Sequence, residues 1–87
     1  MKMFFVGYDE YFDDTVTNAF KQAGCESYLK LYDGKTKETR SFGNANALFM
    51  PVSDEEIPHL VEIVRGLKAE YPTVNLRAFT FPVEECI

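Results

Sequence analysis

The sequence predicts an α+β fold, with four strands and two helices in the order β-α-β-β-α-β. Four short segments carry apolar residues in runs of strand length or at alternate positions, which is typical of strands. Two further segments repeat apolar residues every three or four positions, as amphipathic helices do. A chain of 87 residues with 46% apolar residues is expected to form one packed domain over residues 1–87.

The first strand is predicted over Met3–Tyr8, which is apolar on both faces and therefore indicates a central strand. Gly7 within it would let another backbone approach closely. Asp13 is predicted to cap the helix that follows, and Gly24 to end it in a left-handed conformation. One face of that helix is apolar at positions i, i+3, i+4 and i+7, namely Val16, Ala19, Phe20 and Ala23.

The middle of the chain predicts a second strand over Ser27–Tyr32 and a hairpin turn at Asp33-Gly34. The polar segment Lys35–Phe42 suits either a β-ribbon arm or a mobile loop, and the sequence does not decide between them. A second turn at Gly43-Asn44 is expected to lead into the third strand, Ala45–Val52.

The second helix is predicted from a capping box between Ser53 and Glu56. Pro58 conflicts with a regular helix from Ser53, so either the first turn is distorted or the regular helix starts near Pro58. The apolar stripe of this helix is Ile57, Leu60, Val61, Val64 and Leu67. The last strand is predicted over Val74–Val83.

This order is that of ferredoxin-like domains, in which a four-stranded antiparallel sheet carries both helices on one face. The strands, however, are apolar on both faces. In the third strand Ala45, Ala47 and Phe49 oppose Leu48, Met50 and Val52, and in the fourth Phe79, Phe81 and Val83 oppose Leu76 and Ala78. Because a bare apolar face of this size is rare in monomers, we expect other copies of the chain to cover it.

Composition excludes several classes of function. A net charge of −5 without a basic stripe argues against nucleic acid as a partner. No apolar run is long enough for a membrane-spanning helix and no signal peptide is recognisable, so no membrane insertion and a cytoplasmic location are expected. No nucleophile–base arrangement or phosphate-binding motif appears at a recognisable spacing, so the sequence does not predict an enzyme.

Metal binding has weak support in the sequence. His59 is the only histidine, and one histidine is a poor metal site. Cys86 follows two glutamates and could ligate a soft metal, although a thiol at a fraying end is the simpler interpretation. Cys25 is expected to pack at the start of the second strand. We therefore assign no metal site.

Two groups of cations are candidates for ligand contact. Lys35, Lys37 and Arg40 form the basic cluster of the polar segment, and either clamp an anionic ligand or acidic partner or simply solvate a hairpin. Lys30 and Arg77 each lie inside an apolar strand, where a charge is costly unless it is paired. They are expected to pair with carboxylates of a neighbouring subunit, to line a cleft between subunits and bind phosphate, or to reach water at a sheet edge.

The chain resembles the PII-like superfamily of small trimeric proteins, which includes the PII nitrogen regulators and CutA-type proteins. The similarity runs over most of the chain. It rests on the opening strand, on the helix end Ala19–Gly24, on Gly43–Phe49 running into the acidic cap, and on the closing Phe81–Glu85. The closest resemblance is to short PII-like proteins, some of them associated with heavy-metal efflux transporters.

The resemblance implies a homotrimer whose sheets face inward, which senses a small ligand between subunits and acts on a protein partner. It implies an adenine nucleotide as ligand, before a divalent metal, and a membrane transporter or another regulated protein as partner. Asn44 joins the candidate ligand residues because it ends the loop between the second and third strands. The long loop and the glycine-rich phosphate-binding segment of the nitrogen regulators are absent here.

Two alternatives stay open beside this reading. The first is a CutA-like or efflux-linked protein that responds to metal through Cys86 and His59. The second is a purely structural oligomerisation module without a ligand.

Overall fold

The computed structural model describes residues 1–25, 27–38 and 41–87, with residues 33, 35–38 and 41–43 described by their backbone alone. A turn of 3-10 helix leads into each α-helix, at Glu10–Phe12 and Asp54–Glu56. The strands and α-helices are β1 Lys2–Asp9, α1 Asp13–Gln22, β2 Leu29–Glu38, β3 Ser41–Val52, α2 Ile57–Glu70 and β4 Leu76–Pro82.

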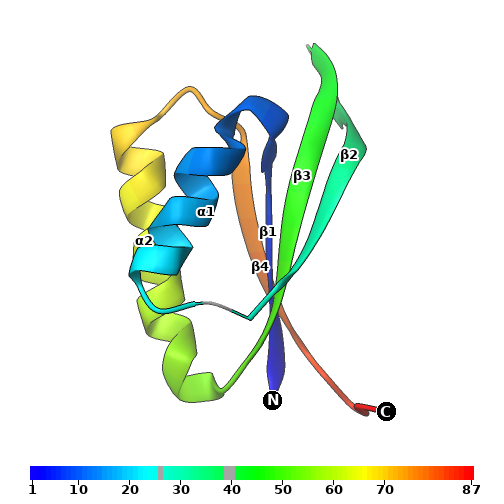
Figure 1. Ribbon diagram of the computed structural model, residues 1–87, viewed down its shortest axis with the longest axis vertical. Helices are drawn as coiled ribbons and strands as arrows, with labels where there is room; N and C mark the ends of the chain where they lie inside the picture. Colours follow the sequence, from blue (N-terminus) through cyan, green and yellow to red (C-terminus); the bar gives the residue numbers. More distant parts are fainter. Residues whose placement is uncertain (26, 39–40) are drawn as a thin grey trace.

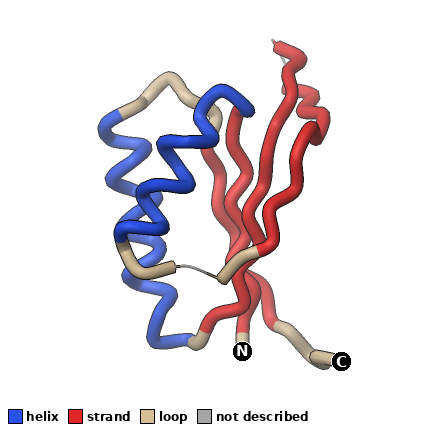
Figure 2. Tube along the Cα trace, viewed as in Figure 1, coloured by secondary structure: helices blue, strands red, loops and turns tan. Residues whose placement is uncertain are grey.

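The sheet has the strand order β2-β3-β1-β4, and all its neighbouring strands are antiparallel. Both helices pack on the same face of it, as Figures 1 and 2 show. The predicted ferredoxin-like α+β fold is therefore confirmed. β1 lies between β3 and β4, which confirms that its doubly apolar sequence marks a central strand.

The hydrophobic core fills the space between the helices and the sheet. The apolar stripes predicted for both helices supply one side of it, and alternate residues of the strands supply the other. Its most deeply buried side chains are Phe4, Val6, Val16, Phe20, Leu48, Met50 and Leu60. Of the other stripe residues, Val64 and Leu67 belong to this core, Ala19, Ile57 and Val61 pack against it from its margin, and Ala23 is half-buried at the end of α1.

The connection between β2 and β3 differs from the prediction. β2 continues to Glu38 and β3 already begins at Ser41, so the turns expected at Asp33-Gly34 and Gly43-Asn44 are wrong. The alternative of a β-ribbon arm is confirmed, because Lys35–Glu38 pair with Ser41–Asn44 in register. The paired ends of both strands, residues 34–38 and 41–45, are called the ribbon arm below; they extend past the helices in Figure 1.

A β-bulge explains why Asp33 and Gly34 do not form a turn. Leu31 pairs with Ala47 and Gly34 pairs with Ala45, so Tyr32 and Asp33 together lie opposite the single residue Asn46. Two residues against one is the definition of a bulge. A side chain at Gly34 would meet the Ala45 carbonyl oxygen at 3.2 Å, so glycine permits the close approach of the two strands there.

At the helix ends, one prediction is wrong and two are confirmed. Asp13 is not the cap of α1, because the cap position is Phe12 and Asp13 is already helical. Gly24 adopts the expected left-handed conformation, with φ of +90°. The capping box of Ser53 and Glu56 is present, with the Ser53 amide donating to the Glu56 carboxylate at 2.9 Å.

Pro58 is accommodated by both changes that the sequence allowed. The first turn after the cap is 3-10, and the α-helix starts at Ile57, so Pro58 occupies its second position. Proline is tolerated there because amide groups in the first turn have no partner within the helix.

Replacing Phe20 tests whether this core provides the stability of the fold. Its ring is fully buried and lies 6.3 Å from the ring of Phe4. We expect Phe20→Ala to lower the free energy of unfolding by about 3–5 kcal/mol, measured by urea denaturation. Tyr11→Ala, at an aromatic ring that is 74% exposed, is the control and should cost about 0.5 kcal/mol or less. Equal losses would contradict the assigned core.

Candidate functional site

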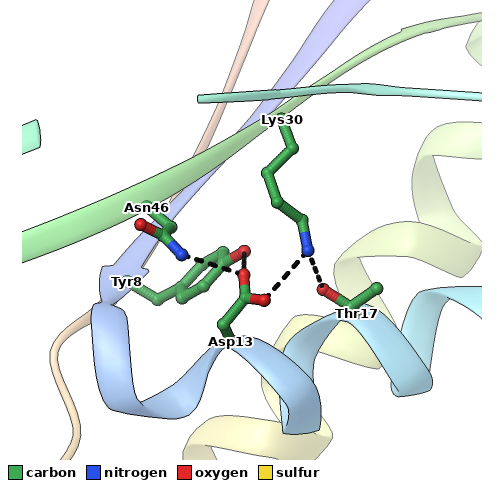
Figure 3. A network of polar contacts seen from close by, with 5 residues as sticks. All are labelled: Tyr8, Asp13, Thr17, Lys30 and Asn46. Carbon is green, nitrogen blue, oxygen red and sulfur yellow. Dashed lines mark hydrogen bonds and ion pairs between the residues drawn. The ribbon is translucent and has the colours of Figure 1, made fainter. Parts of the chain in front are cut away.

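Five polar side chains meet between α1 and the sheet, and together they are called the Asp13 cluster (Figure 3). Its centre is the carboxylate of Asp13, in the first turn of α1. Oδ1 accepts hydrogen bonds from the Tyr8 hydroxyl at 2.6 Å and from the Asn46 side-chain amide at 3.1 Å. Oδ2 accepts one from Lys30 Nζ at 3.0 Å, and the same ammonium donates to the Thr17 hydroxyl at 2.9 Å.

The cluster is shielded from solvent on most sides. Asn46 and Tyr8 are 4% and 2% exposed, and the side chains of Lys30 and Asp13 are 13% and 22% exposed. The Lys30 ammonium also lies 5.5 Å and 6.0 Å from the ring centroids of Tyr32 and Tyr28, within the range of a cation–π contact. A charged pair in such surroundings is stable because nearly every polar atom has a partner.

The protonation equilibria follow from these contacts. Burial alone would raise the pKa of Asp13, but hydrogen bonds from Tyr8, Asn46 and Lys30 outweigh it and hold that pKa below its usual range. Burial would lower the pKa of Lys30, but the hydrogen bond and ion pair with Asp13 raise it. Burial and the neighbouring carboxylate raise the pKa of Tyr8. Asp13 and Lys30 are thus both charged at neutral pH.

The structure locates Lys30 within its own chain's polar contacts. The prediction that the charge of Lys30 is paired is confirmed. The partner, however, is Asp13 of the same chain rather than a carboxylate of a neighbouring subunit. A contact between Lys30 and a ligand stays a prediction.

The opposite face of the sheet carries no helix and is called the open face (Figure 2). Cross-strand pairing arranges its residues in rows. One row is Leu29, Phe49, Phe5 and Phe79, and the next is Leu31, Ala47, Gly7 and Arg77. Among these, Leu29 is 62% and Phe79 is 55% exposed. The apolar face predicted from strand alternation is therefore present and uncovered in the single chain.

Small residues beside the aromatic row leave a hollow of about 310 Å³ in the open face. Ala47 and Gly7 contribute to it, and the ring of Phe5 leans over Gly7, at 3.2 Å from where a side chain would begin. The close approach predicted at Gly7 is thus made by this ring and not by a backbone. Asp9, Asn46, Asn75 and Arg77 are the polar residues of the lining of the hollow, and its walls are mostly apolar.

The candidate ligand residues fall in different places. Arg77 lies on the open face, whereas Lys30 lies on the helix-covered face, so one chain does not bring these two cations together. Asn44 is exposed in the ribbon arm and pairs with Lys35.

The remaining candidates lie partly outside the described residues. Lys35 and Lys37 belong to β2 by their backbone, but their side chains are not described, and Arg40 falls outside the described residues. A site that joins Lys30 and Arg77 would need a second chain.

Three members of the Asp13 cluster were missed from the sequence. Tyr8, Thr17 and Asn46 follow ordinary helix and strand patterns, and Asp13 was interpreted as a cap. The one available signal was Asn46, a polar residue at a core-facing position between Asn44 and Leu48.

The sequence analysis considered one histidine and two cysteines as metal ligands and expected no membrane-spanning helix. His59 and Cys86 are exposed, Cys25 is partly buried, and both cysteines are free. No group of three or more metal-ligating side chains occurs within residues 1–25, 27–38 and 41–87. In the same described part of the chain, no helix is long and apolar enough to cross a membrane.

Comparison with solved structures identifies the fold. A nitrogen regulatory PII-like protein from Thiomonas intermedia, bound to ADP, AMP and bicarbonate, superposes with a TM-score of 0.73 at 15% identity, over 99% of this chain and 94% of that one. A second structure of that protein gives 0.73 at 12% identity, over 91% and 86% of the two chains.

A third similar structure is that of a candidate PII-like signalling protein from Thermus thermophilus. It has a TM-score of 0.64 at 20% identity, covering 92% of this chain and 82% of that one. No protein-family model and no curated protein matches the sequence. The chain therefore has the fold of PII-like proteins, and the resemblance seen in the sequence is confirmed at the level of the fold.

Asp13→Asn tests the charge at the centre of the cluster. Because the folded-state pKa of Asp13 is lowered, its contribution is present above the ordinary carboxyl pKa of about 3.9 and is lost as pH falls through the folded-state value. At pH 7 we expect the variant to lose about 1.5–3 kcal/mol of unfolding free energy.

Repeating the measurement at acidic pH tests whether the charge of Asp13 causes the loss of stability. The difference between wild type and Asp13→Asn should shrink at about pH 3, because this pH lies below the ordinary carboxyl pKa of about 3.9 and the unfolded wild-type chain takes up a proton there more readily than the folded chain. Asp14→Asn, at the exposed neighbouring position, is the matched control and should have little effect at either pH. An equal deficit of Asp13→Asn at both pH values would contradict this account.

Proposed function

We propose that this protein is a non-enzymatic regulator of the PII-like kind. Three copies associate through their open faces, an adenine nucleotide binds between subunits, and the assembly acts on a protein partner in the cytoplasm. The open face is the observation that carries the proposal. It is the surface that a PII-like trimer would cover, and in this chain it is apolar and exposed.

The energetics of the open face favour assembly. Leu29, Leu31, Phe79 and Phe81 are each more than two-fifths exposed. Fully burying one large apolar side chain contributes roughly 1.5–3 kcal/mol, so these four together supply on the order of several kcal/mol per chain. Such a patch is typical of a protein interface.

The nature of the ligand is supported by a structural neighbour and by local charge. The Thiomonas protein of the same fold is bound to ADP, AMP and bicarbonate. In this acidic chain, Arg77 of β4 brings a guanidinium to the lining of the hollow, and Gly34 and Ala45 at the base of the ribbon arm line it from β2 and β3. We place the phosphates of the nucleotide beside Arg77, and Lys30, Lys35, Lys37, Arg40 and Asn44 are further candidate contacts.

The ribbon arm is the natural element to contact a partner. It extends beyond the helical layer (Figure 1), so it can reach another protein while the sheet face is occupied. A membrane transporter or another regulated protein fits this role. The proposal assigns the arm to signalling and the sheet to assembly.

Arg77→Ala tests the ligand site. Removing one charge-assisted contact should weaken ADP binding about tenfold or more, measured by isothermal titration calorimetry. Arg65→Ala, which removes an exposed arginine of α2 paired with Glu62, is the control and should bind ADP as wild type does. Unchanged ADP affinity in Arg77→Ala would remove Arg77 from the site, and a loss of assembly would make its role structural.

Phe79→Glu tests the assembly surface. Because Phe79 is 55% exposed in the single chain, the substitution should leave the circular dichroism spectrum unchanged while a buried carboxylate prevents association. We expect the elution volume in size-exclusion chromatography to shift to that of one chain. Tyr11→Glu, at another exposed aromatic residue, should elute as wild type. If Phe79→Glu also elutes as wild type, the open face is not the interface.

A further inference from the structure

The β-bulge lies where the ribbon arm leaves the body of the sheet. On one side of it Leu31 still pairs with Ala47, and on the other Gly34 pairs with Ala45 at the base of the arm. A bulge bends its strand and increases the local twist, so its geometry sets the direction of whatever follows. The direction of the arm is therefore decided at Asn46, the residue opposite the bulge.

The Asp13 carboxylate accepts hydrogen bonds from both strands, β2 and β3, beside the bulge. Asn46 of β3 donates to Oδ1, and Lys30 of β2, two residues before the bulge begins, donates to Oδ2. Tyr8, which is the direct cross-strand partner of Asn46 on β1, donates to Oδ1 as well. Figure 3 shows these side chains converging from three strands on one residue of α1.

This arrangement makes the bulge register costly to change. A slip of β2 by one residue would move Lys30 to the other face of the sheet, leaving the carboxylate of Asp13 and the hydroxyl of Thr17 with one partner fewer in a partly buried site. The hydrophobic core restrains β2 only weakly, because Leu29 and Leu31 point to the open face and are exposed, and Tyr28, just before the strand, packs against the core from its margin.

We propose that Asp13 is the positioning residue of the ribbon arm: by holding Asn46 and Lys30 on one carboxylate, it fixes the bulge and hence the direction in which the arm leaves the sheet. The regulatory meaning of this restraint rests on the proposed function, in which the arm contacts ligand and partner. Loosening the carboxylate would free the arm while the helices and the rest of the sheet stay packed.

Hydrogen exchange measured by mass spectrometry on wild type, Asp13→Asn and the control Asp14→Asn tests this inference. In Asp13→Asn, amides of residues 29–38 and 41–47 should exchange about tenfold faster or more. Amides of α2 and β4 should be accelerated by no more than the loss of global unfolding free energy dictates, and at least tenfold less than the amides around the bulge, whereas Asp14→Asn should match wild type throughout. A merely stabilising role of Asp13 would instead accelerate exchange in α2 and β4 by the same factor.

Either uniform acceleration or no acceleration near the bulge overturns the inference. If circular dichroism shows that Asp13→Asn does not fold, Lys30→Met and Thr17→Val take its place, because Lys30→Met removes the contacts of the ammonium with Asp13 and Thr17, Thr17→Val removes the second of these, and both leave the carboxylate. They must then show the same localised pattern, with Lys21→Met as the matched control at an exposed lysine of α1. The mass and ADP affinity of wild type, measured on the same preparation, test the proposed function separately.

Discussion

The structure depends on one geometric constraint: two helices cover one face of a four-stranded sheet, while this sheet is apolar on both. On the covered side, Phe4, Val6 and Leu48 pack against Val16 and Phe20 of α1 and form the core. On the other side an equivalent row of apolar side chains meets solvent. The core explains why the chain folds, and the open face explains why folding alone leaves a surface that a second chain can bury.

The Asp13 cluster lies on the same helix-covered face, where α1 meets the edge strand β2. Helix α1 reaches the outer strand β2 through the ion pair of Asp13 with Lys30. A buried ion pair adds modest stability compared with a hydrophobic contact, but it tolerates little displacement, because each charge requires its partner. Polar contacts thus specify geometry at the base of the ribbon arm, while apolar contacts supply stability elsewhere. This division suits the proposed function, in which the arm contacts a partner and the sheet associates with copies of the chain.

Much of the fold could be predicted from periodicity. When one face of a helix or strand is buried, apolar residues recur along it at a fixed spacing, and this spacing is visible in the sequence. The failures share a cause. Asp33-Gly34 has the chemistry of a hairpin turn, but the longer pairing of β2 with β3 absorbed it into a bulge. Asp13 has the chemistry of a helix cap, but its carboxylate serves Lys30 and Asn46, which are 17 and 33 positions away. Turn and cap signals depend on residues close together in the sequence, so they cannot predict contacts between residues this far apart. All the candidate ligand residues, Arg77 included, stay predictions.

The most direct test of the central claim is the mass of the wild-type protein in solution, measured by sedimentation equilibrium over a range of concentrations. Covering the open face with copies of the chain predicts a stable species of three times the 10.0 kDa chain mass. A single species of one chain mass at all concentrations would contradict the account, because the apolar face would then be stable in water without a cover.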